Sequence, residues 1–195
     1  MALDELKMDR RDAALADFTR AIALNPDYVW ARFQRGQLLR ECGRHAEALA
    51  DFEHAARVDP SDASVQAELG ETLRVLRRYD EAVAAFTRAL AIDAGYAWAL
   101  GSRGQALRAL RRYDEALADC DRALELDPEL AWVAAERGEA LRGLGRHDEA
   151  VAAFTQAIAL DPAYAWAVGH RGIALREQGR LDEAVADFDR ALELT

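Results

Sequence analysis

The feature that most constrains the fold of this chain is an internal period of 34 residues, which recurs along nearly all of its 195 residues. Glycine, alanine, phenylalanine and proline each return at this interval, and they keep the same order within it. The glycines are Gly36, Gly70, Gly104, Gly138 and Gly172, and the phenylalanines are Phe18, Phe52, Phe86, Phe154 and Phe188, with Cys120 in the one gap. Several series in one phase cannot arise by chance, and they predict a fold that stacks one structural unit repeatedly.

The first half of each period predicts an amphipathic helix. In the copy that begins at Ala97, residues Leu100, Gly104 and Leu107 are spaced four and three apart, which places them on one face of a helix running to about Leu110. A polar turn follows, and in three copies it holds a glycine, the residue that best tolerates the left-handed backbone after a helix end. These turn glycines are Gly43, Gly145 and Gly179.

The second half of the period predicts another helix, antiparallel to the first because the connection is short. It begins at Asp114 and Glu115, since acidic side chains near a helix N-terminus interact favourably with the helix dipole. It directs Ala116 and Cys120 inward. The helix ends before Pro128, because proline disfavours helical geometry in the residue that precedes it.

A helical pair of 34 residues with Gly, Ala, Phe, Ala and Pro in this phase resembles the tetratricopeptide repeat (TPR). The resemblance implies an all-α fold, a right-handed α-solenoid superhelix of antiparallel helix pairs that forms a single array over residues 1–195. It divides the chain into a partial repeat (1–28), four full repeats (29–62, 63–96, 97–130 and 131–164) and a last repeat without a capping helix (165–195). The chain departs from the family's pattern in its early tryptophan, which stands two residues sooner.

A second stripe lies on roughly the opposite side of the first helix from its buried face. In the copy at 97–130 it consists of Trp98, Gly101, Gln105 and Arg108. In TPR proteins the first helices line a concave groove, so the resemblance places this stripe in the groove. Across the copies we expect the peptide- or partner-binding residues to be Trp30, Trp98, Trp132, Trp166, Arg40, Arg74, Arg108, Arg142, Arg176, Gln37 and Gln105.

These residues predict a non-enzymatic protein–protein interaction scaffold that binds an extended peptide or the tail of a partner. The tryptophans supply stacking and apolar contact, and the arginines attract acidic side chains or a free C-terminus by charge-assisted hydrogen bonds. Three alternatives compete: each tryptophan packs on the neighbouring copy, each arginine pairs with a nearby acid, as Arg142 with Glu139, or duplication simply copied the row. A further arginine series is expected to be structural, with packed stems and solvated heads: Arg35, Arg103, Arg137 and Arg171.

Composition narrows the class of protein. The formal net charge of −10 argues against nucleic acid and anionic membranes as partners. No apolar run approaches the ~20 residues of a membrane-spanning helix, and the first residues lack the apolar core of a signal peptide, so we expect a cytoplasmic protein. The two cysteines form neither a disulfide framework nor a metal-binding set.

No arrangement of catalytic residues stands out, and we expect no enzyme activity, metal or cofactor. The histidines lack metal-ligand spacing. The repeated Asp-Glu pairs point about 100° apart on a helix, which suits a helix start better than acid–base chemistry. Cys120 stands where other copies carry phenylalanine, and we expect slack packing there rather than a nucleophile.

The two ends of the sequence favour an alternative function. The chain starts partway through a first helix, and no polar capping helix follows Thr195. An end repeat exposes the face that a neighbouring repeat would cover. The alternative is therefore a self-assembling array that forms homo-oligomers through its terminal repeats, or the sensor segment of a larger regulatory protein. A designed scaffold fits less well, because irregularities such as Cys120 look inherited.

Overall fold

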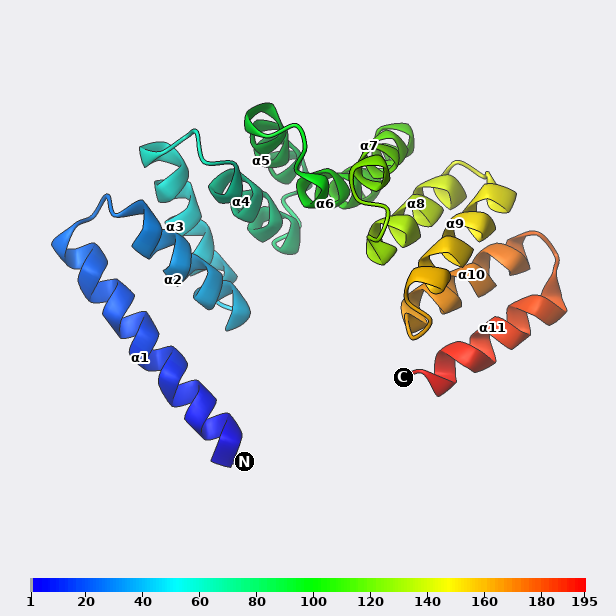
Figure 1. The fold of residues 1–195 in the computed structure, drawn as a ribbon, viewed down its shortest axis with the longest axis horizontal. Coiled ribbons are helices and arrows are strands. Elements are labelled where there is room, and N and C mark those ends of the chain that lie inside the picture. The colour runs from blue at the N-terminus through cyan, green and yellow to red at the C-terminus, as the bar shows by residue number, and fades with distance from the viewer. Residues whose placement is uncertain (1) are drawn as a thin grey trace. The chain divides into compact units, whose positions relative to one another are not determined.

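The computed structural model describes the backbone of residues 2–195 and the side chains from Arg10 onward (Figure 1). Within that range the chain forms eleven α-helices and no strand, which confirms the predicted all-α solenoid of antiparallel helix pairs. The helices are α1 (Ala2–Leu24), α2 (Val29–Glu41), α3 (His45–Val58), α4 (Ala63–Val75), α5 (Tyr79–Ile92), α6 (Ala97–Ala109), α7 (Tyr113–Leu126), α8 (Ala131–Gly143), α9 (His147–Leu160), α10 (Ala165–Glu177) and α11 (Leu181–Glu193).

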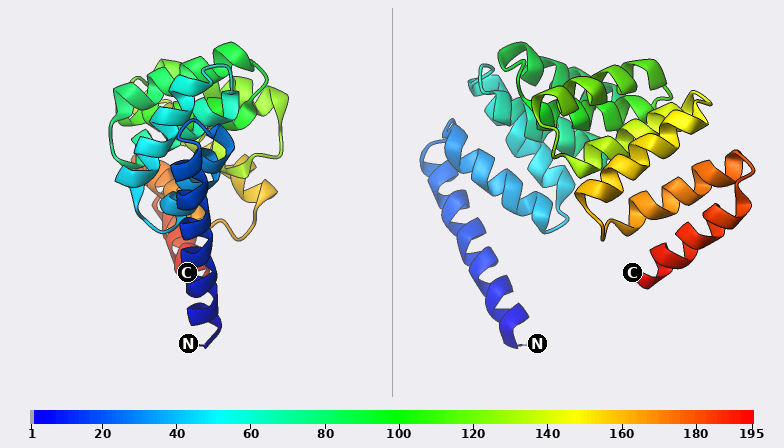
Figure 2. Two further views of the ribbon diagram at one scale, coloured as in Figure 1. Left: turned by 90° about the vertical axis from the view of Figure 1, so that its left-hand side faces the viewer. Right: turned by 45° about the vertical axis from the view of Figure 1, so that its right-hand side comes forward.

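The chain divides into two compact units, Met1–Ala94 and Gly95–Thr195. In the first unit α2 pairs with α3 and α4 pairs with α5, while α1 packs on α2. The second unit holds the pairs α6–α7, α8–α9 and α10–α11 (Figures 1 and 2). Its first helices, α6, α8 and α10, contact one another in sequence order, and each second helix also packs on the next first helix. The predicted stripe residues belong to these first helices, so the stripes of neighbouring repeats lie on helices that contact one another.

The same turn connects the two helices of every pair. Three turns hold glycine in the left-handed conformation, as predicted, with φ between 73° and 79° at Gly43, Gly145 and Gly179. Arg77 and Arg111 take the same position in the other two copies, with φ of 60° and 61°. In the second of these the amide of Arg112 donates to the carbonyl oxygen of Leu107 at 2.9 Å, a bond that every copy repeats. The packed helices therefore impose this turn even where its residue is not glycine.

The core of each pair forms where the repeated aromatic ring lies against the repeated glycine. A Cβ atom on Gly138 would fall 2.8 Å from the Cζ atom of the buried Phe154. The same close approach recurs in the pairs Gly36–Phe52, Gly70–Phe86 and Gly172–Phe188. At Gly104 the nearest atom is the Sγ of Cys120, at 3.2 Å, so this contact is looser. Burial raises the pKa of the Cys120 thiol far above its usual range, which makes it a poor nucleophile.

The beginning of the chain differs from the prediction. We expected the chain to start partway through a first helix, but α1 is one continuous helix from Ala2 to Leu24. A turn within it would break backbone hydrogen bonds, so the unbroken helix is favoured.

Candidate functional site

The four tryptophans lie near the starts of their helices and are partly exposed, Trp30 most of all at 55%. Trp132 of α8 packs against α6, because a Cβ atom on Gly101 would fall 2.5 Å from its Cη2 atom. The alternative in which a tryptophan packs on the neighbouring copy therefore holds for Trp132. Gly101 is buried beneath it, and only part of the indole reaches the surface.

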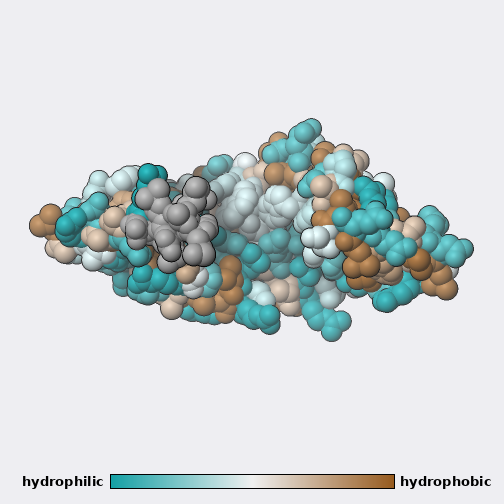
Figure 3. Space-filling view, turned by 90° about the horizontal axis from the view of Figure 1, so that it is seen from below, coloured by the Kyte–Doolittle hydropathy of each residue, from teal (hydrophilic) through white to brown (hydrophobic). Residues whose placement is uncertain are grey.

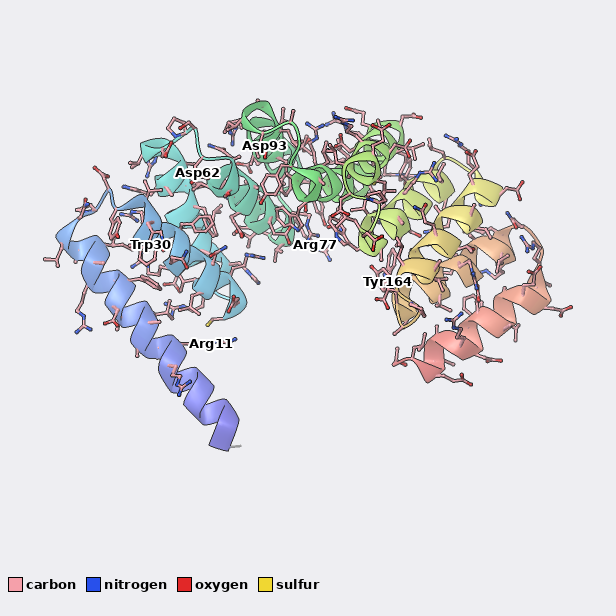
Figure 4. The ribbon with its side chains drawn as sticks, in the orientation of Figure 1. Arg11, Trp30, Asp62, Arg77, Asp93 and Tyr164 are labelled. Atoms are coloured by element: carbon pink, nitrogen blue, oxygen red, sulfur yellow. The ribbon has the colours of Figure 1, made fainter. Side chains whose placement is uncertain are left out.

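Three of the indoles also contact a tyrosine ring two residues earlier, a feature that the sequence reasoning missed. The ring centroids lie 5.8 Å apart in Tyr28–Trp30, 6.0 Å in Tyr96–Trp98 and 5.9 Å in Tyr164–Trp166. Figure 4 labels Trp30 and Tyr164. Trp166 also stacks on His170 with a centroid distance of 3.8 Å. The repeated letters Tyr-x-Trp were the available signal, and these ring contacts hold the indoles in fixed orientations.

Four of the five arginines of the row are paired with carboxylates of their own chain. Arg40 of α2 forms a 2.9 Å salt bridge with Glu68 of α4. Arg108 of α6 forms the equivalent 2.8 Å bridge with Glu136 of α8. The remaining two pairs use an acid three residues earlier, as the local-pairing alternative expected: Glu71–Arg74 and Glu139–Arg142. The four arginine side chains still keep between 27% and 32% of their surface exposed.

The positions of these carboxylates follow a sequence relation that is visible only when neighbouring copies are compared. Where the third residue of the stripe is glutamine, the residue 31 positions later is glutamate. The amide of Gln37 donates to Glu68, and that of Gln105 to Glu136, each at 3.0 Å. Where the third residue is Glu139, the later residue is a histidine hydrogen-bonded to it at 2.8 Å. A carboxylate that is buried, or in the case of Glu68 largely buried, thus accompanies each of these four arginines and balances its charge.

Glu139 shows how firmly these carboxylates are held. The residue is only 5% exposed. Burial by itself raises the pKa of its carboxyl, but hydrogen bonds from His170 and Arg142, and the charges of those groups, outweigh burial and lower the pKa to about 2. Glu139 is therefore ionised at neutral pH. Its hydrogen bond is also the main cause that raises the pKa of Arg142, whose charge is consequently balanced within the protein.

The further arginine series is structural, as expected, but carboxylates hold its heads rather than solvent. Arg103 of α6 donates two hydrogen bonds of 2.7 Å to Asp119 of α7, which is 7% exposed. The same double contact recurs in Arg35–Asp51 and Arg171–Asp187. The prediction of solvated heads is wrong because the second helix places an aspartate opposite the arginine. In the α4–α5 pair both members are apolar instead, Leu69 and Ala85.

The described residues show no arrangement for metal chemistry or membrane insertion. Within that part of the chain no group of three or more His, Cys, Asp or Glu side chains is placed to hold a metal ion. Three histidines contact carboxylates of other elements: His54 lies 2.9 Å from Asp27, His147 lies 3.2 Å from Glu177, and His170 is bonded to Glu139. No helix of the described range is both long and apolar enough to cross a membrane.

The stripe supplies much of the accessible surface of the first helices. Most of α6 is buried; its residues that are not buried are Ala97, Trp98, Arg103, Gln105, Arg108 and Ala109. Three of these are stripe residues, and Arg103 is occupied by Asp119. The surface that α6 offers to another molecule is therefore made chiefly of an indole, an amide and a guanidinium.

A tandem array of antiparallel helix pairs, with a partly exposed polar and aromatic stripe on the first helices, is the architecture of a helical-repeat scaffold for protein–protein interaction. The chain belongs to the tetratricopeptide repeat family. One model of this family matches residues 97–130, and a second matches residues 1–63, 33–97 and 136–195.

Solved structures share this fold. YrrB, described as a TPR protein with an unusual peptide-binding site, is 26% identical with a TM-score of 0.71, and the match covers 91% of this chain and 92% of that chain. A thermophilic TPR protein of Thermus thermophilus is 26% identical with a TM-score of 0.73, covering 86% and 91%. MamA is 25% identical with a TM-score of 0.73, covering 82% and 93%. Among curated proteins no significant match is found.

Proposed function

We propose that the protein is a non-enzymatic scaffold that binds an extended peptide, or the tail of a partner protein, along the stripe on its first helices. In the second unit the contacts come from Trp98, Gln105 and Arg108 of α6 and from Trp132 and Arg142 of α8. In the first unit the corresponding residues are Trp30, Gln37, Arg40 and Arg74. Trp166 of α10 extends the surface.

The exposure pattern of α6 is the observation that carries this proposal. Three stripe residues, Trp98, Gln105 and Arg108, stay accessible, while the opposite face of the helix is buried. The accessible side chains are also held in place, since Gln105 and Arg108 both bond to Glu136. Side chains fixed before binding lose less conformational entropy when a peptide arrives. The likeness to YrrB, a TPR protein described by its peptide-binding site, supports the same function.

The charge pattern favours recognition of the main chain of a peptide over recognition of its acidic side chains. A guanidinium has five N–H donors, and Arg108 uses only some of them on Glu136. The remaining donors suit carbonyl oxygens, whereas an added carboxylate is repelled by the buried acids beside the row. The expected preference for acidic groups or a free C-terminus is thereby narrowed to Arg176, which is exposed and forms no salt bridge with the side chains of residues 10–195.

A library of random linear peptides displayed on phage tests the proposal. All four tryptophans of the chain belong to the proposed surface, so a selected peptide that binds there should change the intrinsic tryptophan emission. Replacing the pair Arg108→Gln and Glu136→Gln removes both charges and leaves a neutral amide, which still forms hydrogen bonds, at each position. We expect about 10-fold weaker binding, because a charge-assisted hydrogen bond to the peptide is lost.

The matched control carries the same charge change away from the stripe. Arg122 and Glu125 form an exposed 2.8 Å pair on α7, and the variant Arg122→Gln with Glu125→Gln should bind as the parent does. Equal affinity in both double variants, with unchanged circular dichroism, would remove the stripe from the binding surface. Selected peptides dominated by Asp and Glu would contradict main-chain recognition.

A further inference from the structure

A hollow lies on the surface of the first unit between two second helices, α3 and α5, which both pack on α4. Its volume is about 380 Å³, and it adjoins a smaller hollow of about 240 Å³. The face of the protein seen in Figure 3 has hydrophobic residues in small groups among hydrophilic ones. This hollow instead has an apolar base. We call it the Leu69 groove and define it by Glu53, Ala56, Leu69, Leu73, Ala84 and Arg88.

In other repeats the equivalent groove holds an arginine of the chain itself. The groove over α2 is lined by Arg35 and Thr19. Arg35 donates to Thr19, 16 residues earlier, at 3.1 Å, and to Asp51, 16 residues later, at 2.7 Å. The groove over α10 repeats both contacts with its own residues. Each guanidinium is thus held between an acceptor on the preceding helix and one on its own second helix.

Leu69 takes the place of this arginine in α4, and Glu53 stands 16 residues before it. The α8–α9 repeat has the same surroundings but keeps the arginine. There Arg137 donates to Asp121, 16 residues earlier, at 2.6 Å. In both repeats the residue 16 positions later is alanine. The α4–α5 repeat therefore has the carboxylate of such a pair without its guanidinium.

Glu53 has no partner of its own. Its side chain is exposed and forms no hydrogen bond or salt bridge within the part of the chain whose side chains the structure describes. The charge of Glu53 acts on Arg78, but Arg78 donates two hydrogen bonds of 2.6 Å to Glu81. Arg88 lines the groove, and its Nε donates to Gln66 at 2.9 Å. Because neither guanidinium contacts Glu53, its carboxylate is open to a cation from outside.

We propose that the Leu69 groove binds an arginine side chain of a partner protein. The guanidinium pairs with Glu53 as that of Arg137 pairs with Asp121, and the aliphatic stem lies over Leu69 and beside Ala84. Arginine fits better than lysine, because its planar fork can donate two parallel hydrogen bonds to one carboxylate. Second helices flank this groove, whereas the stripe lies on the first helices, so the proposal does not rest on the peptide-binding function.

Two capped peptides test the groove. One is acetyl-Ala-Ala-Arg-Ala-Ala-amide, and the other carries citrulline, which keeps the shape of arginine without its charge. An NMR titration of the full chain follows the methyl signals of Leu69 and Leu73. We expect the arginine peptide to shift these signals with a Kd on the order of 1–10 mM, because one side chain supplies most of the contact. The citrulline peptide should bind at least about 5-fold more weakly.

Variants separate the carboxylate from the rest of the groove. Glu53→Gln should fold, since the residue is exposed, and should lower the affinity for the arginine peptide to that for the citrulline peptide. Leu69→Arg should abolish the shift at Leu73, because the new guanidinium pairs with the carboxylate as Arg137 does. Asp121→Asn is the matched control. It removes a carboxylate that Arg137 already holds, so binding at the groove should stay unchanged.

Three results would overturn the proposal. The first is equal affinity for the two peptides, and the second is an arginine peptide that binds Glu53→Gln as tightly as the parent. Either would show that Glu53 does not select the ligand. The third is the absence of shifts at Leu69 and Leu73. If the tryptophan signals move instead, the peptide lies on the stripe, and the proposed peptide-binding function stands while this one fails.

Discussion

Two adjacent repeats, α6–α7 and α8–α9, meet the same structural requirements with different residues. In α8–α9 a buried phenylalanine ring fills the space above the repeated glycine, whereas in α6–α7 a thiol does. Arg103 bonds forward to the aspartate of its own second helix, but Arg137 bonds back to Asp121 of the preceding pair, because Ala153 stands opposite it. The period thus fixes the backbone positions, while the two side chains that form each contact differ together from one repeat to the next. A side chain in this array is understood only together with its partner.

The largest test of that conclusion is the buried pair Arg103–Asp119. Asp119→Ala removes a nearly buried carboxylate from a cation that is itself largely covered. We expect a loss of about 2–4 kcal/mol in the free energy of unfolding, measured by urea titration. Asp121→Ala removes the carboxylate that Arg137 of α8 contacts on α7, but the Asp121 side chain is 46% exposed. That loss should be only about 0–1 kcal/mol.

The α4–α5 pair suggests the control for this experiment. It carries Leu69 and Ala85 at the two positions, both buried. The double change Arg103→Leu with Asp119→Ala copies that solution, and it should recover most of the stability lost in Asp119→Ala. If the double variant is as unstable as Asp119→Ala alone, the apolar pair of α4–α5 cannot replace the charged pair of α6–α7.

A smaller effect on stability is expected at Gly104 and Gly138, the repeated glycines of these two repeats. A Cβ at Gly138 would lie 2.8 Å from the ring of Phe154, so Gly138→Ala should destabilise the protein by about 1–2 kcal/mol after the gain in helix propensity is counted. At Gly104 the nearest atom is Cys120 Sγ at 3.2 Å. Gly104→Ala should therefore be neutral or stabilising by up to about 1 kcal/mol. Thermal or urea unfolding of both variants measures the difference, and equal losses would mean that the thiol packs as tightly as the ring.

The sequence predicts the helices well because the period appears in local spacing. The first helix of the copy at 97–130 was expected from Ala97 to about Leu110, and α6 ends at Ala109. Local spacing did not predict that α1 is one continuous helix from Ala2 to Leu24. Cys120 was also recognised as a core residue from its phase alone.

The candidate surface was less predictable because its contacts join residues of different repeats. The stripe was found by its spacing, but the link from Gln105 to Glu136 spans 31 residues and appears only when neighbouring copies are compared as pairs. Arg103 was expected to be solvated because its partner, Asp119, lies 16 residues later on the second helix of the same repeat, beyond the local spacing of a single helix. Which of the stripe residues touch a partner stays a prediction, since exposure shows access and not binding.

The smallest test concerns the turns. Arg111 holds the left-handed conformation with φ of 61°, which costs a side-chain-bearing residue about 1–2 kcal/mol, whereas Gly145 takes it freely in the next repeat. Arg111→Gly should stabilise the protein by about 0.5–1 kcal/mol, because the gain is partly offset by greater freedom of the unfolded chain. Gly145→Ala should destabilise it by about 1 kcal/mol, purely through the backbone, since nothing lies within 4 Å of the added methyl group.

Arg111→Ala separates the backbone from the side chain. The hydrogen bond from Arg111 to Tyr113 is long, 3.3 Å, and exposed, so alanine should leave stability nearly unchanged and show that the glycine effect is conformational. If Arg111→Gly also leaves stability unchanged, while Gly145→Ala is destabilising, then the left-handed backbone costs different free energies in the turns of the two repeats. The difference between α6–α7 and α8–α9 would in that case extend from side-chain pairs to the backbone itself.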